Sequence, residues 1–178
     1  MYSIKKIIPF YTLIVFLAIT SIHQSDAATD REIWDFIQTE ALKIDIDPTF
    51  IYSIAFAESS LNPWANTPRA RGIMQIKRGT WYDMTSIPYY KAWNWKINIK
   101  TGILYLNYCK KYLKKYESFS YPLLAACYRY GPNAVRKSEF NLKNLEMPKN
   151  KIYKKIFSGD NQPIEEPVSR TTSSLFNS

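Results

Sequence analysis

The sequence predicts a single all-α domain, and three features of the chain support that fold class. Apolar residues recur at helical spacing in several segments, helix start and stop signals separate these segments, and no run alternates apolar and polar residues as a strand does. No internal repeat and no glycine-rich phosphate loop interrupts the pattern. A length of 178 residues suits one domain with a hydrophobic core and is short for two.

Two helices open the predicted domain. Thr29 or Asp30 can cap the first helix, which we expect to reach about Lys43, and its apolar side consists of Ile33, Phe36, Ile37 and Ala41. After a short turn, Asp47 and Pro48 supply the N-cap and the first position of the second helix. One face of that helix should be buried, because apolar residues recur at Phe50, Ile51, Ile54 and Ala55.

The rest of the domain is also predicted to be helical, with two intervening loops. Proline and glycine mark the breaks, most clearly at Gly131-Pro132. In order, we expect a loop over 62–71, the segment 72–76, a short helix over 80–85, an aromatic loop over 88–95, the longest helix over 96–116, and helices over 122–130, 133–140 and 148–156.

The two ends of the chain are predicted to lie outside this domain. A basic start, an apolar run over 7–22 that is short for a membrane span, and small residues at Ser25 and Ala27 are typical of a cleaved secretory signal. An uncleaved N-terminal anchor is the alternative. The end of the chain is polar and lacks periodicity. The predicted organisation is therefore a signal over 1–27, an enzyme domain over 28–157 and a flexible tail over 158–178, in an exported protein of the periplasm or cell envelope.

Cysteine and histidine usage limits the chemistry. The one histidine, His23, lies in the predicted signal, so serine–histidine and cysteine–histidine catalysis are excluded and a transition-metal site is not expected. We expect no metal and no cofactor. Cys109 and Cys127 fall on separate predicted helices, where they form either a disulfide or two buried thiols.

The charge indicates an acidic partner. A formal net charge of +9 favours an anionic cell-wall or membrane surface. Nucleic acid is the other usual partner of a basic chain, and we do not expect it for an exported protein. Many of the lysines form an ordinary solvated surface in this interpretation, and the protein is expected to be a monomer.

Glu58 is the candidate catalytic residue. It continues the apolar stripe of the second helix, and Asn62-Pro63 should end that helix soon afterwards. Glu58 would then lie near the negative end of the helix dipole, partly buried, and both effects raise the pKa of a carboxyl group. A carboxyl that stays protonated near neutral pH suits general acid catalysis. The alternative is a glutamate at the edge of the core, or one paired with Arg69 or Arg71.

Aromatic residues suggest a sugar-binding groove. They make up 16% of the chain, with 14 tyrosines and 5 tryptophans. Aromatic rings stack on sugars, and tyrosine hydroxyls can bond sugar hydroxyls. Any single one of them is more simply a core residue, but together with a protonated glutamate they indicate polysaccharide cleavage.

Four ordered motifs resemble the soluble lytic transglycosylases, which are lysozyme-like enzymes that cleave peptidoglycan. These motifs are Glu58-Ser59 with Asn62-Pro63, Gly72-Ile73-Met74-Gln75, Asn98-Ile99 with Gly102 and Tyr105-Leu106, and Ala125-Ala126-Cys127-Tyr128 with Gly131-Pro132. The resemblance covers nearly all of the predicted domain. It implies a fold like that of goose-type lysozyme.

The resemblance also implies roles for particular residues. Glu58 would be the single catalytic acid, and Ser59 would orient it or the substrate. Met74 and Gln75 would line the cleft. Tyr128 would face Glu58 and help to place it or the scissile sugar. Ser59, Met74, Gln75 and Tyr128 are thus the predicted substrate-binding residues.

Three residues depart from the family's usual pattern. Arg129 and Tyr130 stand where asparagine and alanine are usual, and Arg69 replaces a frequent glycine. A guanidinium group near the site would lower the pKa of Glu58, or bind a carboxylate of a peptide stem.

The implied reaction cleaves the β-1,4 bond between N-acetylmuramic acid and N-acetylglucosamine and leaves a 1,6-anhydromuramoyl end. Most glycosidases use two carboxylates, whereas between Glu58 and Glu117 this chain offers only Asp83. One acid with substrate assistance is therefore expected. The alternatives are a hydrolytic lysozyme in which Asp83 positions water, and a glycan-binding or weakly active component of a secretion or conjugation apparatus.

Overall fold

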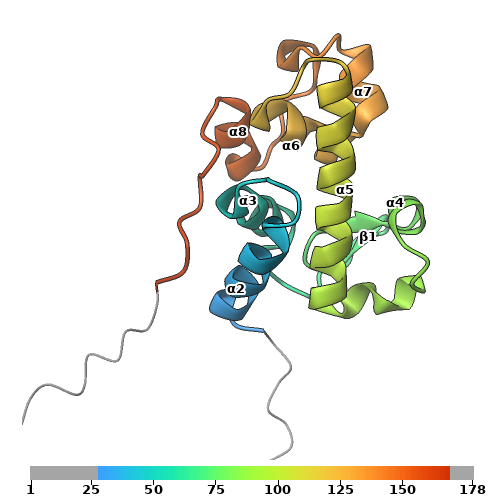
Figure 1. The fold of residues 1–178 in the computed structure, drawn as a ribbon, viewed down its shortest axis with the longest axis vertical. Helices are drawn as coiled ribbons and strands as arrows, with labels where there is room; N and C mark the ends of the chain where they lie inside the picture. The colour runs from blue at the N-terminus through green and yellow to red at the C-terminus, as the bar shows by residue number, and fades with distance from the viewer. Residues whose placement is uncertain (1–27, 169–178) are drawn as a thin grey trace, which may run out of the picture.

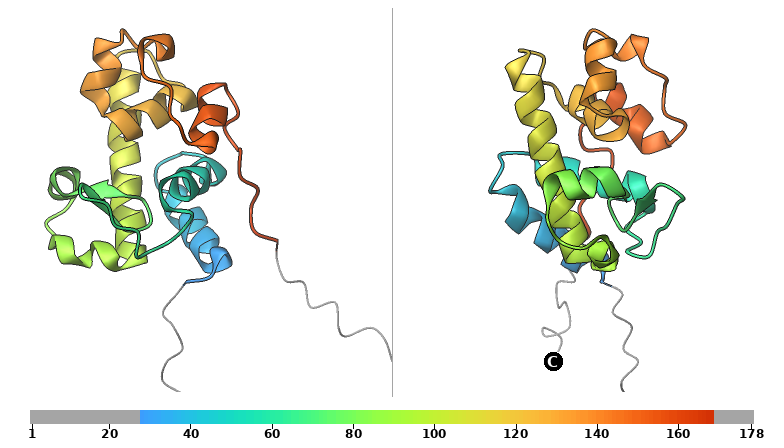
Figure 2. Two further views of the ribbon diagram at one scale, coloured as in Figure 1. Left: turned by 180° about the vertical axis from the view of Figure 1, so that it is seen from behind. Right: turned by 90° about the vertical axis from the view of Figure 1, so that its right-hand side faces the viewer.

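The computed structural model describes residues 28–168, and the predicted signal over 1–27 lies outside them, as does the end of the predicted tail. Helix α5 (Trp95–Lys115) is the longest helix and runs through the domain. Figure 2 shows helices α6 (Tyr121–Tyr130), α7 (Pro132–Lys137) and α8 (Lys151–Phe157) gathered at one end of α5. A small hairpin with α4 (Arg78–Met84) lies at the other end, and α3 (Pro48–Ser59) lies between them. The fold is helical, as the sequence predicts.

Helices α2 (Asp30–Ala41) and α3 (Pro48–Ser59) begin where the capping signals place them. The Thr29 hydroxyl accepts a hydrogen bond from the Glu32 amide, and the Glu32 carboxylate accepts one from the Thr29 backbone amide. At α3, the Asp47 carboxylate accepts from the Thr49 amide at 2.7 Å. The two helices pack against each other and carry much of the core.

Helix α3 is buried more completely than its sequence pattern predicts. Tyr52 and Ser53 are as buried as the expected apolar face, so the helix is surrounded by protein along its first two turns. Tyr52 achieves this by packing edge-on against Trp34 of α2, with ring centroids 5.4 Å apart. A helix enclosed in this way holds its last turn, and therefore Glu58, in a fixed place.

A small antiparallel hairpin follows α3 and is absent from the sequence-based prediction. Strands β1 (Ala70–Arg71) and β2 (Ile76–Lys77) pair with Ala70 opposite Lys77. Two residues per strand are too few to show alternation, which explains the omission. The hairpin leads into α4 (Arg78–Met84), and the expected aromatic loop contains the 3₁₀ turn η1 (Tyr89–Trp93).

Asn98 of α5 holds the hairpin loop from within the core. Its side-chain oxygen accepts from the Met74 amide at 2.8 Å, and its amide group donates to the carbonyls of Arg71 and Ala92, each at 3.0 Å. Gly72 has a φ of +78°, and a Cβ there would lie 2.3 Å from the Asn98 nitrogen. The motif Gly72–Gln75 is therefore a loop fitted against one buried asparagine.

The C-terminal helices differ from the prediction mainly at their ends. Helix α6 (Tyr121–Tyr130) starts at the Ser120 cap and ends at Gly131, whose φ is +90°. Helix α7 (Pro132–Lys137) follows at once, then the 3₁₀ turn η2 (Leu142–Asn144) and helix α8 (Lys151–Phe157). Helix α8 begins three residues after Pro148, because Asn150 caps it through the amides of Ile152 and Tyr153.

The two cysteines are both buried free thiols in this structure. Cys109 of α5 lies against Cys127 of α6, and burial together with the neighbouring thiol raises the pKa of Cys109. Of the two alternatives left open by the sequence, the structure shows the buried thiols.

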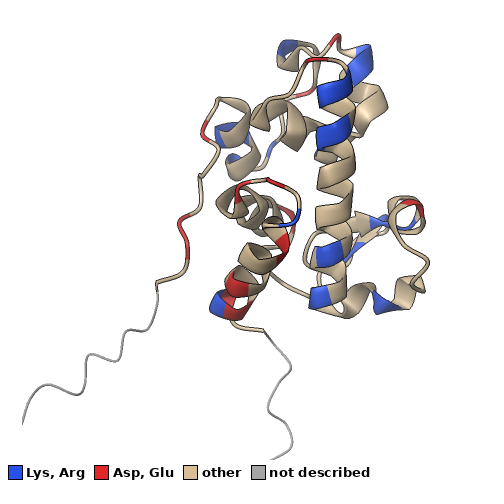
Figure 3. Ribbon diagram, viewed as in Figure 1, with Lys and Arg blue, Asp and Glu red and all other residues tan. Residues whose placement is uncertain are grey.

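The surface charge is uneven (Figure 3). Lysines and arginines recur on α5, α8 and around the hairpin, whereas acidic residues gather on α2. In the described part of the predicted tail, residues 158–168 form no helix or strand, and Gln162 donates to Asp47 at 2.6 Å. None of the helices within 28–168 has the length and apolar character of a membrane span.

Candidate active site

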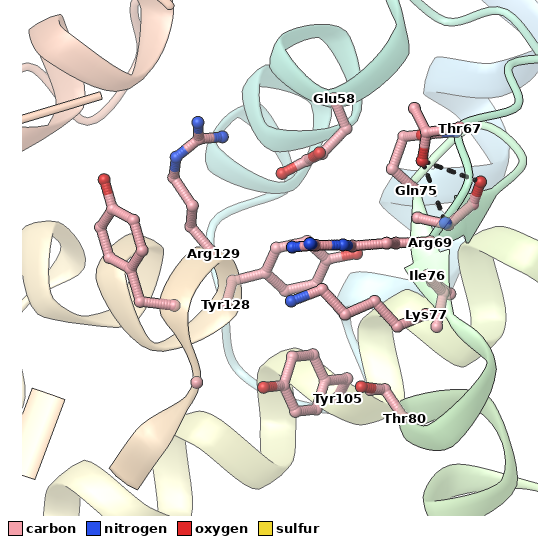
Figure 4. A pocket seen from close by; sticks show the side chains of 13 residues that line it. Glu58, Thr67, Arg69, Gln75, Ile76, Lys77, Thr80, Tyr105, Tyr128 and Arg129 are labelled. Atoms are coloured by element: carbon pink, nitrogen blue, oxygen red, sulfur yellow. Dashed lines mark hydrogen bonds between the residues drawn. The ribbon is translucent and has the colours of Figure 1, made fainter. Parts of the chain in front are cut away.

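A cavity of about 480 Å³ opens beside Glu58 (Figure 4). Five elements contribute to it: α3, the hairpin region, α4, α5 and the end of α6. The lining residues are Glu58, Thr67, Arg69, Ala70, Gln75, Ile76, Lys77, Thr80, Tyr105, Tyr128, Arg129, Tyr130 and Gly131. All four motifs that carry the family resemblance thus contribute a lining residue, and Asn98 of the third motif also supports the loop from behind.

Glu58 lies in the last turn of α3, as the sequence predicts. Ser60 ends the helix in the left-handed conformation, with a φ of +53°. Burial raises the pKa of Glu58, while a hydrogen bond from Tyr153 and the charges of Arg129 and Lys77 act in the opposite direction. Burial is the strongest of these influences, so the protonated form persists to higher pH than in an ordinary glutamate.

Tyr153 of α8 is the direct partner of Glu58. Its hydroxyl donates a hydrogen bond to Oε1 of Glu58, and the tyrosine is fully buried. Burial and the nearby carboxylate raise the pKa of Tyr153 well above its usual value, so it remains a donor. Tyr153 is not among the site residues predicted from the sequence. A tyrosine on the apolar side of a short lysine-rich helix was the available signal, since a buried tyrosine needs a hydrogen-bond partner.

Tyr128 lines the cavity, but its hydroxyl is directed elsewhere. It donates to the Met74 carbonyl at 2.7 Å, and the side chain is buried. Burial and the nearby Glu58 raise its pKa. The ring of Tyr128 is therefore beside Glu58, as expected, while the hydroxyl fixes the hairpin loop.

Gln75 also lines the cavity and braces the same loop. Its side-chain nitrogen donates to the carbonyls of Ala65 and Gly72, each at 2.9 Å, and its φ is +46°. This backbone conformation is rare for a residue with a side chain, and the two hydrogen bonds hold it.

Ser59 and Met74 lie outside the lining of the cavity, which differs from their expected place. The Ser59 hydroxyl donates to the Ile73 carbonyl at 2.6 Å and so joins the end of α3 to the hairpin loop. Met74 is fully buried, and its sulfur lies where a Cβ on Gly102 would be. Both residues support the site from behind: Ser59 ties the end of α3 to the loop, and the loop turns the side chain of Met74 into the core.

The charges in the cavity are one carboxylate and three cations. Arg69 and Lys77 enter from the hairpin side and Arg129 from the opposite side (Figure 4). Arg71, by contrast, stacks on the rings of Tyr89 and Trp93. Neither Arg69 nor Arg71, the two arginines proposed as ion-pair partners, forms a salt bridge with Glu58 within 4.0 Å. Asp83 is exposed and does not line the cavity.

The expected aromatic groove is present only in part. Tyr105, Tyr128 and Tyr130 line the cavity. Many of the other aromatic residues fill the core, and Trp64 and Tyr90 are exposed away from the lining. Within residues 28–168 no three histidine, cysteine or acidic side chains are grouped to hold a metal ion.

The fold and the cavity define a lysozyme-like domain with a single acidic side chain in its cleft. The profile of the Transglycosylase SLT domain family matches residues 35–150. The chain belongs to this family. A comparison with curated proteins gave no match.

One solved structure supports the same fold. It is an inactive mutant of the lytic transglycosylase Slt from Pseudomonas aeruginosa, with a TM-score of 0.53 and 22% sequence identity. The similarity covers 86% of this chain and 26% of that one, so this protein corresponds to about a quarter of the larger enzyme. At this identity the comparison concerns the fold alone.

Proposed function

We propose that this protein is an exported peptidoglycan lytic transglycosylase that acts in the periplasm or cell envelope. It would cleave the β-1,4 bond between N-acetylmuramic acid and N-acetylglucosamine without water. The observation that carries this proposal is Glu58, whose pKa is raised by burial and which is the only acidic side chain that lines the cavity within residues 28–168. One carboxyl must then serve first as the acid and later as the base.

The proposed reaction has three steps. Glu58 gives its proton to the glycosidic oxygen, and the bond from that oxygen to C1 of the muramoyl residue breaks. The oxygen of the substrate's own acetamido group stabilises the cationic carbon. The Glu58 carboxylate then takes the proton of the 6-hydroxyl while O6 bonds to C1, which yields the 1,6-anhydro end and restores the acid.

Tyr153, Arg129 and Lys77 adjust the pKa of Glu58 during this cycle. In the first step Glu58 must be protonated, which burial favours. In the carboxylate state, the Tyr153 hydroxyl and the charges of Arg129 and Lys77 stabilise the anion. The site therefore suits a group that must be present in both forms during one turnover.

A turbidity assay tests the proposal. The purified protein should clear a peptidoglycan suspension, and Glu58→Gln should lose this activity while its circular dichroism spectrum and melting transition remain those of a folded protein. Clearing by Glu58→Gln at the wild-type rate would remove Glu58 from the mechanism.

A second candidate is a glycan-binding or weakly active component of a secretion or conjugation apparatus. The observation that favours it is the charge of Arg129, which lowers the pKa of Glu58 and so weakens it as an acid. Binding to peptidoglycan without clearing would support this role. The hydrolytic alternative with Asp83 has no such support, because Asp83 lies outside the cavity lining.

A further inference from the structure

Two tryptophans outside the cavity lie ring against ring at the surface. Trp64 belongs to the loop between α3 and β1, and Trp93 is the last residue of the 3₁₀ turn η1. Their ring centroids are 6.1 Å apart, and the ring planes are inclined by 31°. Trp64 is 61% exposed, although burial of a tryptophan is strongly favourable. Neither ring lines the cavity beside Glu58, so the catalytic cycle does not account for this exposure.

A row of stacked groups supports the pair from the core. The guanidinium of Arg71 lies 5.3 Å from the ring centroid of Trp93 and 4.9 Å from that of Tyr89. Tyr89 in turn packs edge-on against the fully buried Trp81, with centroids 5.8 Å apart. The row therefore begins in the core at Trp81 and ends at the exposed ring of Trp64. A ring supported in this way can bind a ligand at little cost in conformational entropy.

The backbone segments that carry the two tryptophans are also fixed. The Trp64 amide donates to Oδ1 of Asn62 at 2.9 Å, which holds the loop in a turn. The turn η1 is tied to α5, because the Ala92 carbonyl accepts from the Asn98 side chain at 3.0 Å. The spacing of the two rings is therefore set by the fold before a ligand arrives.

The surroundings of the pair are rich in polar and aromatic groups. Tyr90 is 63% exposed and shares a side of η1 with Trp93, because side chains three residues apart eclipse in a 3₁₀ turn. Asn62 and Asn66 are exposed on the Trp64 loop and offer side-chain amides. Rings that lie among amides suit a ligand with both apolar faces and hydroxyl groups, which is the chemistry of a sugar.

We propose that Trp64 and Trp93, with Tyr90 beside them, form a second glycan-binding site outside the cavity, where they stack on the sugar rings of a polysaccharide. The apolar face of a sugar ring would cover an indole, while its hydroxyls reach the neighbouring amides. The identification of this polysaccharide as peptidoglycan rests on the proposed function, whereas the stacking site does not. Two sites on one protein raise its apparent affinity for a polymer that can occupy both, so this surface would hold the protein on the cell wall.

Titration with a neutral chito-oligosaccharide in the Glu58→Gln background tests the site without turnover. The first readout is tryptophan fluorescence, because the lining of the cavity within residues 28–168 includes no tryptophan. We expect the sugar to change the emission of the Glu58→Gln parent. The additional substitution Trp64→Ala should remove most of that change, since it removes the exposed ring.

Sedimentation with insoluble peptidoglycan measures the same site on the proposed substrate. In about 1 M salt, contacts between exposed charges are screened beyond about 3 Å, so adhesion through the surface lysines is suppressed. We expect Trp64→Ala to bind about three- to tenfold more weakly than the parent, and Trp64→Tyr, which keeps a ring, to lose less. Phe119→Ala is the matched control, because Phe119 is also an exposed aromatic residue and lies between α5 and α6.

Three outcomes would overturn the inference. Equal fluorescence titrations and equal sedimentation for the parent and Trp64→Ala would show that the ring meets no sugar. An equal loss in Phe119→Ala would show that exposed aromatic residues adhere to the wall without a site. Binding of anionic phospholipid vesicles through Trp64, with no response to sugar, would assign this surface to a membrane. Failure of the wild-type protein to release any product would contradict the proposed function alone, and a sugar response that depends on Trp64 would still support the second site.

Discussion

The hydroxyl of Tyr153 donates a hydrogen bond to the carboxyl of Glu58, although the two residues are 95 positions apart in the chain. Helices α3 and α8 pack against each other, and this contact places the donor in a fully buried position. The candidate acid is thus held by a helix near the end of the domain. Its properties depend on the fold as a whole.

Replacing Tyr153 by phenylalanine should shift the pH dependence of cleavage. The hydrogen bond stabilises the carboxylate and lowers the pKa of Glu58, so its removal raises that pKa. Because Glu58 acts as an acid when protonated, the fall in rate at alkaline pH should move to higher pH. The measurement is kcat/KM against pH. An alkaline limb that stays in place or moves down would contradict the assigned role.

Arg129→Asn should move the same limb in the same direction, through charge instead of a hydrogen bond. The guanidinium lowers the pKa of Glu58, and asparagine removes that charge. Arg129→Lys keeps the charge and serves as the control, with its alkaline limb close to that of the wild type. If the lysine and asparagine variants give the same pH profile, the electrostatic explanation fails.

Glu58→Gln should stabilise the protein at neutral and alkaline pH. A carboxyl whose pKa is higher in the folded than in the unfolded state binds more protons when folded between the two values, so the free energy of unfolding falls as pH rises through that interval. Glutamine avoids this loss. Each unit of pKa difference is about 1.4 kcal/mol and corresponds to a gain of about 3–5 °C in melting temperature near pH 8.

The same comparison at low pH is the control for that prediction. Below the pKa of glutamate in the unfolded chain both forms are neutral, and the difference in melting temperature between wild type and Glu58→Gln should become small. A difference that is equal at pH 4 and pH 8 would mean that the charge of Glu58 is not its cause.

Gly72→Ala should destabilise the fold by roughly 2–4 kcal/mol, through a left-handed backbone and an overlap with Asn98. Gly79→Ala is the matched control: Gly79 lies in α4, and a Cβ there meets nothing within 4 Å. Alanine at that position should be neutral or stabilising by up to about 1 kcal/mol. Urea denaturation measures both, and equal midpoints for the two variants would refute the packing argument.

Local signals in the sequence predict the helix starts well. Thr29, Asp47 with Pro48, and the Gly131-Pro132 break all act where the sequence places them, because caps and prolines depend on near neighbours. The position of Glu58 in the last turn of α3 follows from the same signals.

Features that depend on distant contacts were not predicted. The hairpin is held by Asn98 of α5, and Tyr153 reaches Glu58 through the packing of α8 on α3. Met74 belongs to a motif that the family resemblance placed in the cleft, yet its side chain turns inward over Gly102. A motif gives the residue types at a site, while the direction of each side chain is decided by the loop that carries it.

Mass spectrometry of the products released from peptidoglycan tests the central claim most directly. If Glu58 acts alone as acid and base, the wild-type protein releases muropeptides with 1,6-anhydro ends, each lighter by one water than a hydrolysis product, and Glu58→Gln releases none. Products with ordinary reducing ends, or anhydro products from Glu58→Gln at the wild-type rate, would contradict it.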